Sequence, residues 1–177
     1  MISVIIPTPD DDPVLIETLA ALVAGIADGV LRDAVIVGPA SPRIDEMAEA
    51  AGATRITVTG SQDEMIIAGA HKARADYCFV IAAGSVPIGH WTGALAESVN
   101  RIDDPRDAGL FSLAPRAGLA QAVKNGLISL ISLWSGRPHP RQGFLAARNT
   151  LEAGTNRFRL FRIEAAVSDR RIHRLSR

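Results

Sequence analysis

Polar side chains that could hold an anionic ligand occur directly after two apolar runs of this 177-residue chain. Thr8 and Asp10 follow the run at residues 2–6, and Ser85 follows the run at residues 77–81. Short apolar runs bounded by Gly and Pro predict buried strands, and ligands of open α/β sheets bind at the carboxyl ends of such strands. We therefore expect these groups to lie at a binding site. The alternative is that they cap the amide groups of nearby turns and helices.

The second of these strands ends in a turn of small residues, 82–85, whose atoms we expect to face any ligand. This turn contains no carboxylate, whereas a hard divalent cation is normally held by one or two of them. Cys78 is the only cysteine and lies within the predicted strand, which favours a core role. Residues 7–10 lack the glycines of the dinucleotide fingerprint. The sequence thus predicts neither a metal ion nor a nicotinamide or flavin cofactor.

The charges are distributed unevenly although the net charge is zero. Residues 1–136 contain 9 Lys/Arg and 16 Asp/Glu, whereas residues 137–177 contain 10 Arg and 3 Asp/Glu. An arginine-rich segment suits phosphate or anionic lipid head groups, and it can equally neutralise the acidic part of the same chain. We expect no nucleic acid among the partners.

Strand and helix patterns alternate four times in the first 87 residues, with short connections between them. Apolar, mostly β-branched runs predict strands at 2–6, 34–37, 55–58 and 77–81. Helical spacing and capping residues predict three helices. The first has an acidic N-cap at 10–12, Pro13 at its first helical position and an end near Gly25 or Gly29. The second runs from the Ser41 cap to Gly52, and the third is opened by the Ser61–Glu64 capping-box pair. This alternation predicts a Rossmann-like α/β domain with parallel strands and right-handed crossovers.

The alternation is less regular after residue 87. We expect a helix at 90–99, a strand at 109–113, an amphipathic helix at 118–134, and late strands at 143–147 and 158–163, the last at a sheet edge. The amphipathic helix could lie at a membrane interface beside the arginine-rich end or on a partner protein, or it could cover its own sheet. No signal-peptide pattern or membrane-spanning run is readable, so we expect a cytoplasmic protein, with peripheral membrane attachment as the alternative.

Several of these segments together resemble family 2 glycosyltransferases, in particular a small bacterial branch. The resemblance covers most of the chain and rests on four stretches, which are residues 3–8, 15–19, 69–77 and 136–148. It implies a single GT-A domain at 1–177, with a mostly parallel mixed sheet between two helix layers, a nucleotide-binding half at 1–87 and an acceptor-side half at 88–177. It also implies a nucleotide-sugar or nucleoside diphosphate as ligand, near Pro7, Thr8, Asp10, Gly38, Ala82, Gly84, Ser85 and Gln142.

This sequence lacks nearly every functional carboxylate of the family pattern. Gly38 and Pro39 stand where the family has an acidic pair, residues 82–84 where it has the metal-binding Asp-x-Asp, and Arg141 where the branch has Asp before Gln142. The Glu-Asp pair expected after Gly154 is missing. By resemblance, the metal ligands and the base are therefore absent.

Two functions follow from these departures. In the first, the chain is a glycosyltransferase without a metal, in which Arg137 and Arg141 supply positive charge and His139 is the base, so that His139 and Arg141 are the candidate catalytic residues. In the second, it is a non-catalytic binding or scaffold module of the same fold, and the polar loop around His139 is ordinary surface.

Overall fold

The computed structural model describes residues 1–9, 14–114, 135–155 and 157–169. Within these residues, a mixed sheet of eight strands has the order β3-β2-β1-β4-β7-β6-β8-β5. The predicted amphipathic helix at 118–134, the acidic residues 10–12 and the end of the chain from 170 lie outside the described residues.

The amino-terminal half of the sheet consists of four parallel strands, as the sequence predicts. These strands are β1 (Ile2–Pro7), β2 (Leu31–Gly38), β3 (Thr54–Thr57) and β4 (Tyr77–Val80), and β1 pairs with both β2 and β4. The chain therefore moves outward from β1 to β3 on one side and returns to the other side at β4. The carboxyl ends of β1 and β4 meet at this switch point, which is where ligands of such sheets bind.

The second half of the sheet is mixed. It contains β5 (Ser85–Ile88), β6 (Asp107–Leu113), β7 (Phe144–Ala147) and β8 (Arg159–Asp169). Strand β7 is antiparallel to both β4 and β6, while β8 is parallel to β6 and antiparallel to β5.

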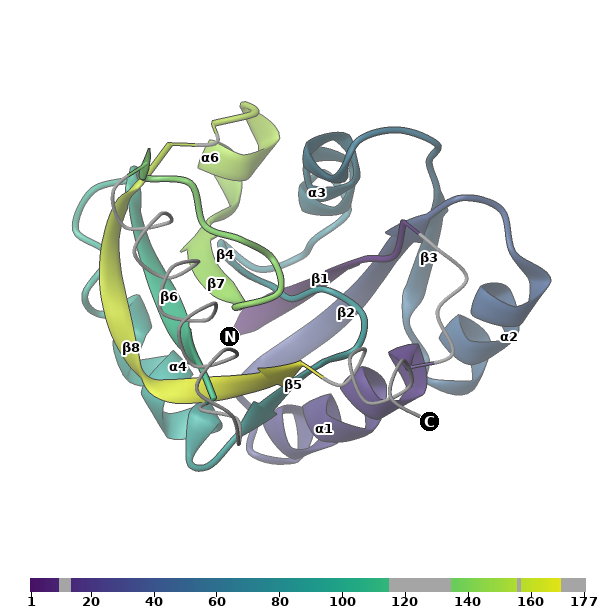
Figure 1. Cartoon of the computed structure of the whole chain (residues 1–177), viewed down its shortest axis with the longest axis horizontal. Coiled ribbons are helices and arrows are strands. Elements are labelled where there is room, and N and C mark those ends of the chain that lie inside the picture. The colour runs from purple at the N-terminus through teal and green to yellow at the C-terminus, as the bar shows by residue number, and fades with distance from the viewer. Residues whose placement is uncertain (10–13, 115–134, 156, 170–177) are drawn as a thin grey trace, which may run out of the picture.

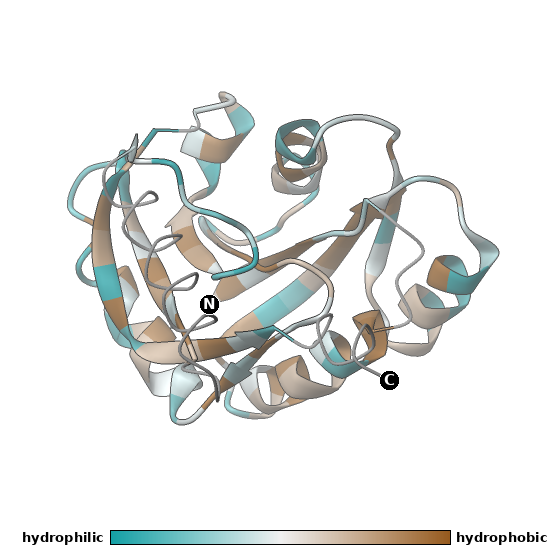
Figure 2. Cartoon of the chain, viewed as in Figure 1, coloured by the Kyte–Doolittle hydropathy of each residue, from teal (hydrophilic) through white to brown (hydrophobic). Residues whose placement is uncertain are grey.

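Helices cover both faces of the sheet, which gives three layers (Figure 1). Helices α1 (Leu15–Ala27), α2 (Pro42–Ala50) and α4 (Trp91–Val99) pack on one face, around a core that includes Phe79 and Trp91. Helix α3 (Gln62–Ala70) and the short α6 (Arg148–Glu152) pack on the other face, where Cys78 is buried. The strands between them are mainly hydrophobic (Figure 2), because both of their faces are covered.

Local signals in the sequence place the helix starts correctly in two cases. The Ser41 side chain caps α2 by accepting a hydrogen bond from the Ile44 amide at 3.3 Å. Ser61 and Glu64 form the predicted capping box at the start of α3. The prediction was wrong for α1, because the described helix begins at Leu15 and its N-cap position is Val14, which provides no side-chain cap.

The predicted strand at 158–163 corresponds to the first part of β8, which begins at Arg159. Residues 159–162 pair with β6, whereas β5 pairs with β8 only further along, at residues 166–169, so the predicted stretch lies at the sheet edge as expected. The sequence did not predict β5, which begins at Ser85, the last residue of the predicted turn, and contains Pro87. Proline lacks an amide hydrogen and is tolerated in an edge strand, which is the position that β5 occupies.

Candidate functional site

The ends of β1 and β2 are packed tightly together at the predicted site. Thr8 is fully buried, and its Oγ1 donates a hydrogen bond to the carbonyl of Val37 at 3.0 Å. A Cβ atom on Gly38 would lie only 2.1 Å from the Thr8 carbonyl oxygen, so no side chain fits between the two strand ends. Pro7 and the Thr8 hydroxyl are therefore buried at this end of the sheet. Asp10 lies outside the described residues.

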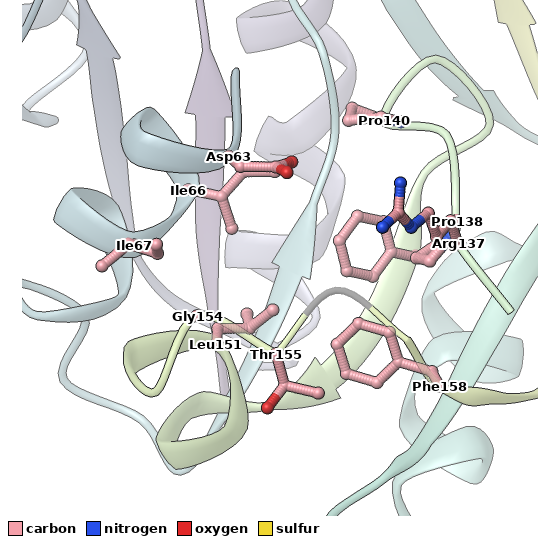
Figure 3. A pocket seen from close by; sticks show the side chains of 11 residues that line it. Asp63, Ile66, Ile67, Arg137, Pro138, Pro140, Leu151, Gly154, Thr155 and Phe158 are labelled. Atoms are coloured by element: carbon pink, nitrogen blue, oxygen red, sulfur yellow. The ribbon is translucent and has the colours of Figure 1, made fainter. Parts of the chain in front are cut away.

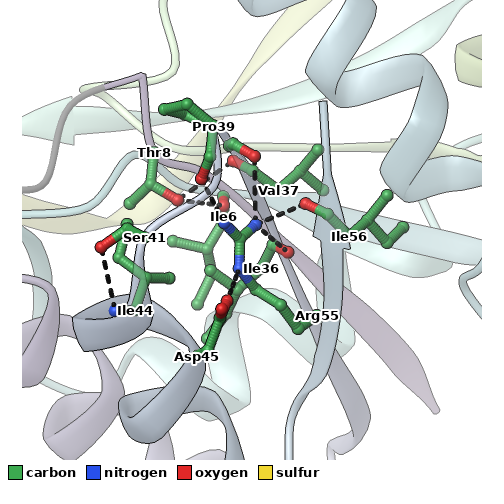
Figure 4. A network of polar contacts seen from close by, with 11 residues as sticks. Ile6, Thr8, Ile36, Val37, Pro39, Ser41, Ile44, Asp45, Arg55 and Ile56 are labelled. Carbon is green, nitrogen blue, oxygen red and sulfur yellow. Dashed lines mark hydrogen bonds and ion pairs between the residues drawn. The ribbon is translucent and has the colours of Figure 1, made fainter. Parts of the chain in front are cut away.

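A guanidinium occupies the space beside Gly38, where the resemblance implies an acidic pair (Figure 4). The Arg55 side chain, of which 13% is exposed, donates to the backbone carbonyls of Pro39 and Ile56 and to that of Gly38 at 3.2 Å. Its Nε also pairs with Asp45 at 2.9 Å. These bonds fasten the end of β2 to β3 and to α2. Arg55 was not identified as a structural residue from the sequence. The signal that could have done so is a single charged residue in a short, otherwise uncharged strand.

The turn after β4 is buried, contrary to the expectation that residues 82–85 face a ligand. Ala82, Ala83 and Ser85 are each at most 1% exposed, and Gly84 is also buried. Thr18 of α1 is hydrogen-bonded to the turn on one side. Its Oγ1 accepts from the Gly84 amide at 2.9 Å and donates to the Ser85 carbonyl at 3.0 Å. Gly84 has a φ of 82°, a backbone conformation that glycine adopts readily.

The segment that precedes β7 closes the turn from the other side. The Ala82 amide donates to the carbonyl of Pro140 at 3.0 Å, and the Ser85 hydroxyl donates to the carbonyl of Arg141 at 3.1 Å. Gln142, in the same segment, is fully buried. These two segments, which the resemblance implies lie around one ligand, are in contact, and their polar groups bind one another. The Thr8 and Ser85 hydroxyls thus bind the chain itself, although they donate to carbonyl groups and do not cap amides as the alternative expected.

His139 and Arg141 lie at the surface of this closing segment. Burial of part of the His139 ring and the charge of Arg141 lower the pKa of His139, while Asp169 opposes this shift. The Arg141 amide donates to Nδ1 of His139 at 3.2 Å, which is consistent with a neutral imidazole. A neutral ring whose Nδ1 already accepts a hydrogen bond has its proton on Nε2. Neither ring nitrogen is then available as a free acceptor, which weakens His139 as a base.

A small pocket of about 80 Å³ lies beside the closing segment, between α3, α6 and the start of β8 (Figure 3). Its walls are largely apolar and include Ile66, Phe144 and Phe158, while Asp63 and Arg137 are its charged residues. Arg137, rather than Arg141, is the arginine that lines this pocket. The volume admits a group of the size of a phosphate, which is smaller than ordinary ligand sites of about 300–1,000 Å³.

The residues at this edge do not fit a divalent metal ion. Ala82, Ala83 and Gly84 offer no side-chain oxygen, and the amides of Ala82, Gly84 and Ser85 donate to partners in the chain. Across the described ranges, no group of three His, Cys, Asp or Glu side chains could hold a metal. In the same ranges, no helix is long and apolar enough to cross a membrane.

No family model and no curated protein matches this sequence. Solved structures do match in fold. Mannosyltransferase PcManGT from Pyrobaculum calidifontis, in complex with GDP-Man and Mn²⁺, has a TM-score of 0.55 and 18% identity over 86% of this chain and 46% of its own. Glucosyl-3-phosphoglycerate synthase from Mycobacterium tuberculosis has a TM-score of 0.57 and 14% identity over 84% and 57%. S. aureus TarS has a TM-score of 0.60 and 14% identity over 94% and 36%.

This chain therefore spans about half or less of the length of those three proteins. At such low identity, the likeness shows the fold alone. The three-layer α/β architecture is the GT-A fold, as the sequence resemblance implied.

Proposed function

We propose that this chain is a non-catalytic binding module with the glycosyltransferase GT-A fold. The observation that supports this most directly is the closed turn after β4. The amides of Ala82 and Gly84 and the hydroxyl of Ser85 are bonded to Pro140, Thr18 and Arg141 respectively, and the turn has no carboxylate. The position at which the fold would present a metal to a nucleotide-sugar is thus filled by the chain itself.

The chemistry of sugar transfer explains why this closure matters. Departure of a nucleoside diphosphate places negative charge on its phosphate oxygens, and a metal ion or fixed cations must stabilise that charge. Loss of one such electrostatic contact costs about 2.7–4 kcal/mol of barrier. A missing general base lowers the rate by about 10²–10⁴-fold more. A protein that has neither the stabilising cation nor the general base can keep the fold but does not catalyse sugar transfer.

The first test is nucleotide binding by calorimetry, with UDP, GDP, UDP-glucose and GDP-mannose, each with and without Mn²⁺. We expect that Mn²⁺ changes none of these affinities, because no carboxylate in the turn can bind it. We also expect no release of free diphosphate from either sugar nucleotide. A Mn²⁺-dependent gain in affinity, or release of UDP or GDP above a protein-free blank, would contradict the proposal.

The second test asks whether the turn is as closed as its burial indicates. Ala82→Asp places a carboxylate in a site that is 1% exposed, so we expect a loss of about 2–4 kcal/mol in the free energy of unfolding. The matched control is Ala96→Asp on the exposed face of α4, where the expected loss is below about 1 kcal/mol. If Ala82→Asp is as stable as the control and gains Mn²⁺ binding, the turn is an open site.

Metal-independent sugar transfer is the second candidate function, and the position of Arg137 in the pocket favours it. In that case Arg137 holds a phosphate group, and Arg137→Ala weakens UDP or GDP binding by about tenfold or more. Arg141→Ala is the matched control, because Arg141 is exposed and does not line the pocket. If the protein binds neither nucleotide, this candidate fails.

A further inference from the structure

We propose that the groove between α1 and α2 binds a single-chain anionic amphiphile, such as a long-chain alkyl carboxylate. Its alkyl chain would lie along α1, and its head group would be held by Arg32 and Arg74. This groove opens toward the amino-terminal ends of the strands, on the side opposite to the closed turn after β4. The inference therefore concerns a second site.

The groove has the size and the lining of a ligand site. Its volume is about 690 Å³, within the range of about 300–1,000 Å³ that is typical of small-molecule sites. One wall consists of α1 side chains, including Leu19, Val23 and Ile26, and the other wall includes Met47 of α2. Val4 of β1 contributes to the floor. Such a surface is apolar over most of its length.

The α1 wall is unusually apolar for a surface that water contacts. Ile16, Val23 and Ile26 are 60%, 62% and 51% exposed, and among the described residues the only other large hydrophobic side chains exposed in this way are Met1 and Ile88. They lie seven and three residues apart, so they share one side of α1. The helix is coloured hydrophobic over much of its length (Figure 2). Covering this stripe with an alkyl chain removes apolar surface from water.

Positive charge at one end of the groove selects the head group. The Arg32 and Arg74 side chains both line the groove, and Arg32 Nη1 donates to the Arg74 carbonyl at 3.1 Å, which places the two residues side by side. Neither has an ion-pair partner within the described part of the chain. Guanidinium groups bind carboxylate and phosphate through paired hydrogen bonds.

One carboxylate also lines this end of the groove. Asp33 Oδ1 accepts from the Ser3 hydroxyl at 2.5 Å, and its Oδ2 is buried without a hydrogen-bond partner among the described residues. Two guanidinium groups outnumber this single carboxylate, so the end of the groove is positive. An anionic head group fits this charge better than a cationic one. The chain's own segment 118–134 fits poorly, because its only charged residue is Lys124.

The experiment is calorimetric titration of the full chain with dodecanoate below its micelle concentration. We expect one site, with weaker binding of dodecanol and of dodecyltrimethylammonium. Arg32→Ala/Arg74→Ala should weaken dodecanoate binding by about tenfold or more and leave dodecanol binding unchanged. Arg43→Ala/Arg106→Ala is the matched control, because both arginines are exposed and neither lines the groove.

A second variant tests the groove itself. Ala20 is exposed and lines the groove, so Ala20→Trp fills it without entering the core, and circular dichroism checks that the variant folds. We expect this variant to lose binding of both dodecanoate and dodecanol. Equal dodecanoate affinity in the wild type and the double arginine variant, equally tight binding of the cationic amphiphile, or binding only to anionic vesicles would overturn the proposal. None of these measurements involves a nucleotide, so their failure is distinguishable from failure of the proposed function.

Discussion

Individual residues at the carboxyl edge of the sheet have structural roles where the fold would permit ligand contacts. Arg55 is the clearest case, because its guanidinium satisfies carbonyl groups at the ends of β2 and β3 and pairs with Asp45 of α2. Five donors in a planar fork suit such a task, and lysine cannot replace them. The guanidinium of Arg55 therefore has a structural role, because its donors are used in these contacts.

The Arg55 contacts predict a large effect of its removal. Arg55→Ala leaves several backbone carbonyls without this donor, and we expect a loss of about 2–4 kcal/mol in the free energy of unfolding. Urea denaturation measures this loss. Arg43→Ala on the exposed side of α2 is the control, with an expected change below about 0.5 kcal/mol. A loss for Arg55→Ala no larger than that of the control would show that these contacts contribute little.

Two glycines give opposite predictions for the same substitution. Gly38→Ala places a methyl group 2.1 Å from the backbone oxygen of Thr8, which cannot move without separating β1 from β2, so we expect a loss of at least about 2 kcal/mol. Gly93→Ala in α4 meets no atom within 4 Å and should stabilise the protein by about 0.4–1 kcal/mol. Thermal melting of both variants tests the pair. A tolerated Gly38→Ala would mean that the strand ends are less tightly closed.

At the scale of elements, the start of α3 depends on pH. The Glu64 carboxylate accepts from the Ser61 amide at 2.6 Å and from its hydroxyl at 2.9 Å, and these bonds lower the pKa of Glu64 below its ordinary value of 4.5. A carboxylate whose folded-state pKa is depressed stabilises the fold above pH 4.5. That contribution is lost as the pH falls through the lower folded-state value.

The variant Glu64→Gln tests this dependence, because it retains an acceptor but does not titrate. We expect it to be less stable than the wild type at pH 7, with a difference that shrinks as the pH falls below 4.5. Urea denaturation between pH 3 and pH 7 measures the difference. A difference that is constant over this range would show that ionised Glu64 makes no net contribution to the cap.

At the scale of the whole molecule, the buried thiol reports on the integrity of the sheet. Cys78 lies in β4 with no exposed surface, and burial raises its pKa to about 12, against the opposing charge of Arg148. Since the thiolate is the reactive form, the folded protein should react with Ellman's reagent at pH 8 only through global unfolding. We expect the labelling rate to rise with urea in parallel with the unfolded fraction. Complete labelling of the native protein within seconds would contradict the burial of β4.

The parallel half of the sheet and the capped starts of α2 and α3 could be predicted from the sequence alone. These features depend on residues close together in the chain, such as the apolar runs of β1 and β4 or the Ser61–Glu64 pair. Hydrophobic periodicity and capping act within a few residues, so they are readable without a structure. The missing carboxylates at residues 82–84 were readable for the same reason.

Only the tertiary structure decided whether the candidate site is open. The closure of the turn after β4 depends on bonds between residues far apart in the sequence, as between Ser85 and Arg141 or between Thr18 and Gly84. The position of Arg55 and the pairing of β5 with β8 are equally non-local. A serine or threonine hydroxyl can bind a ligand or the backbone with the same chemistry, and which of the two it binds depends on what the fold brings within 3 Å or so of it.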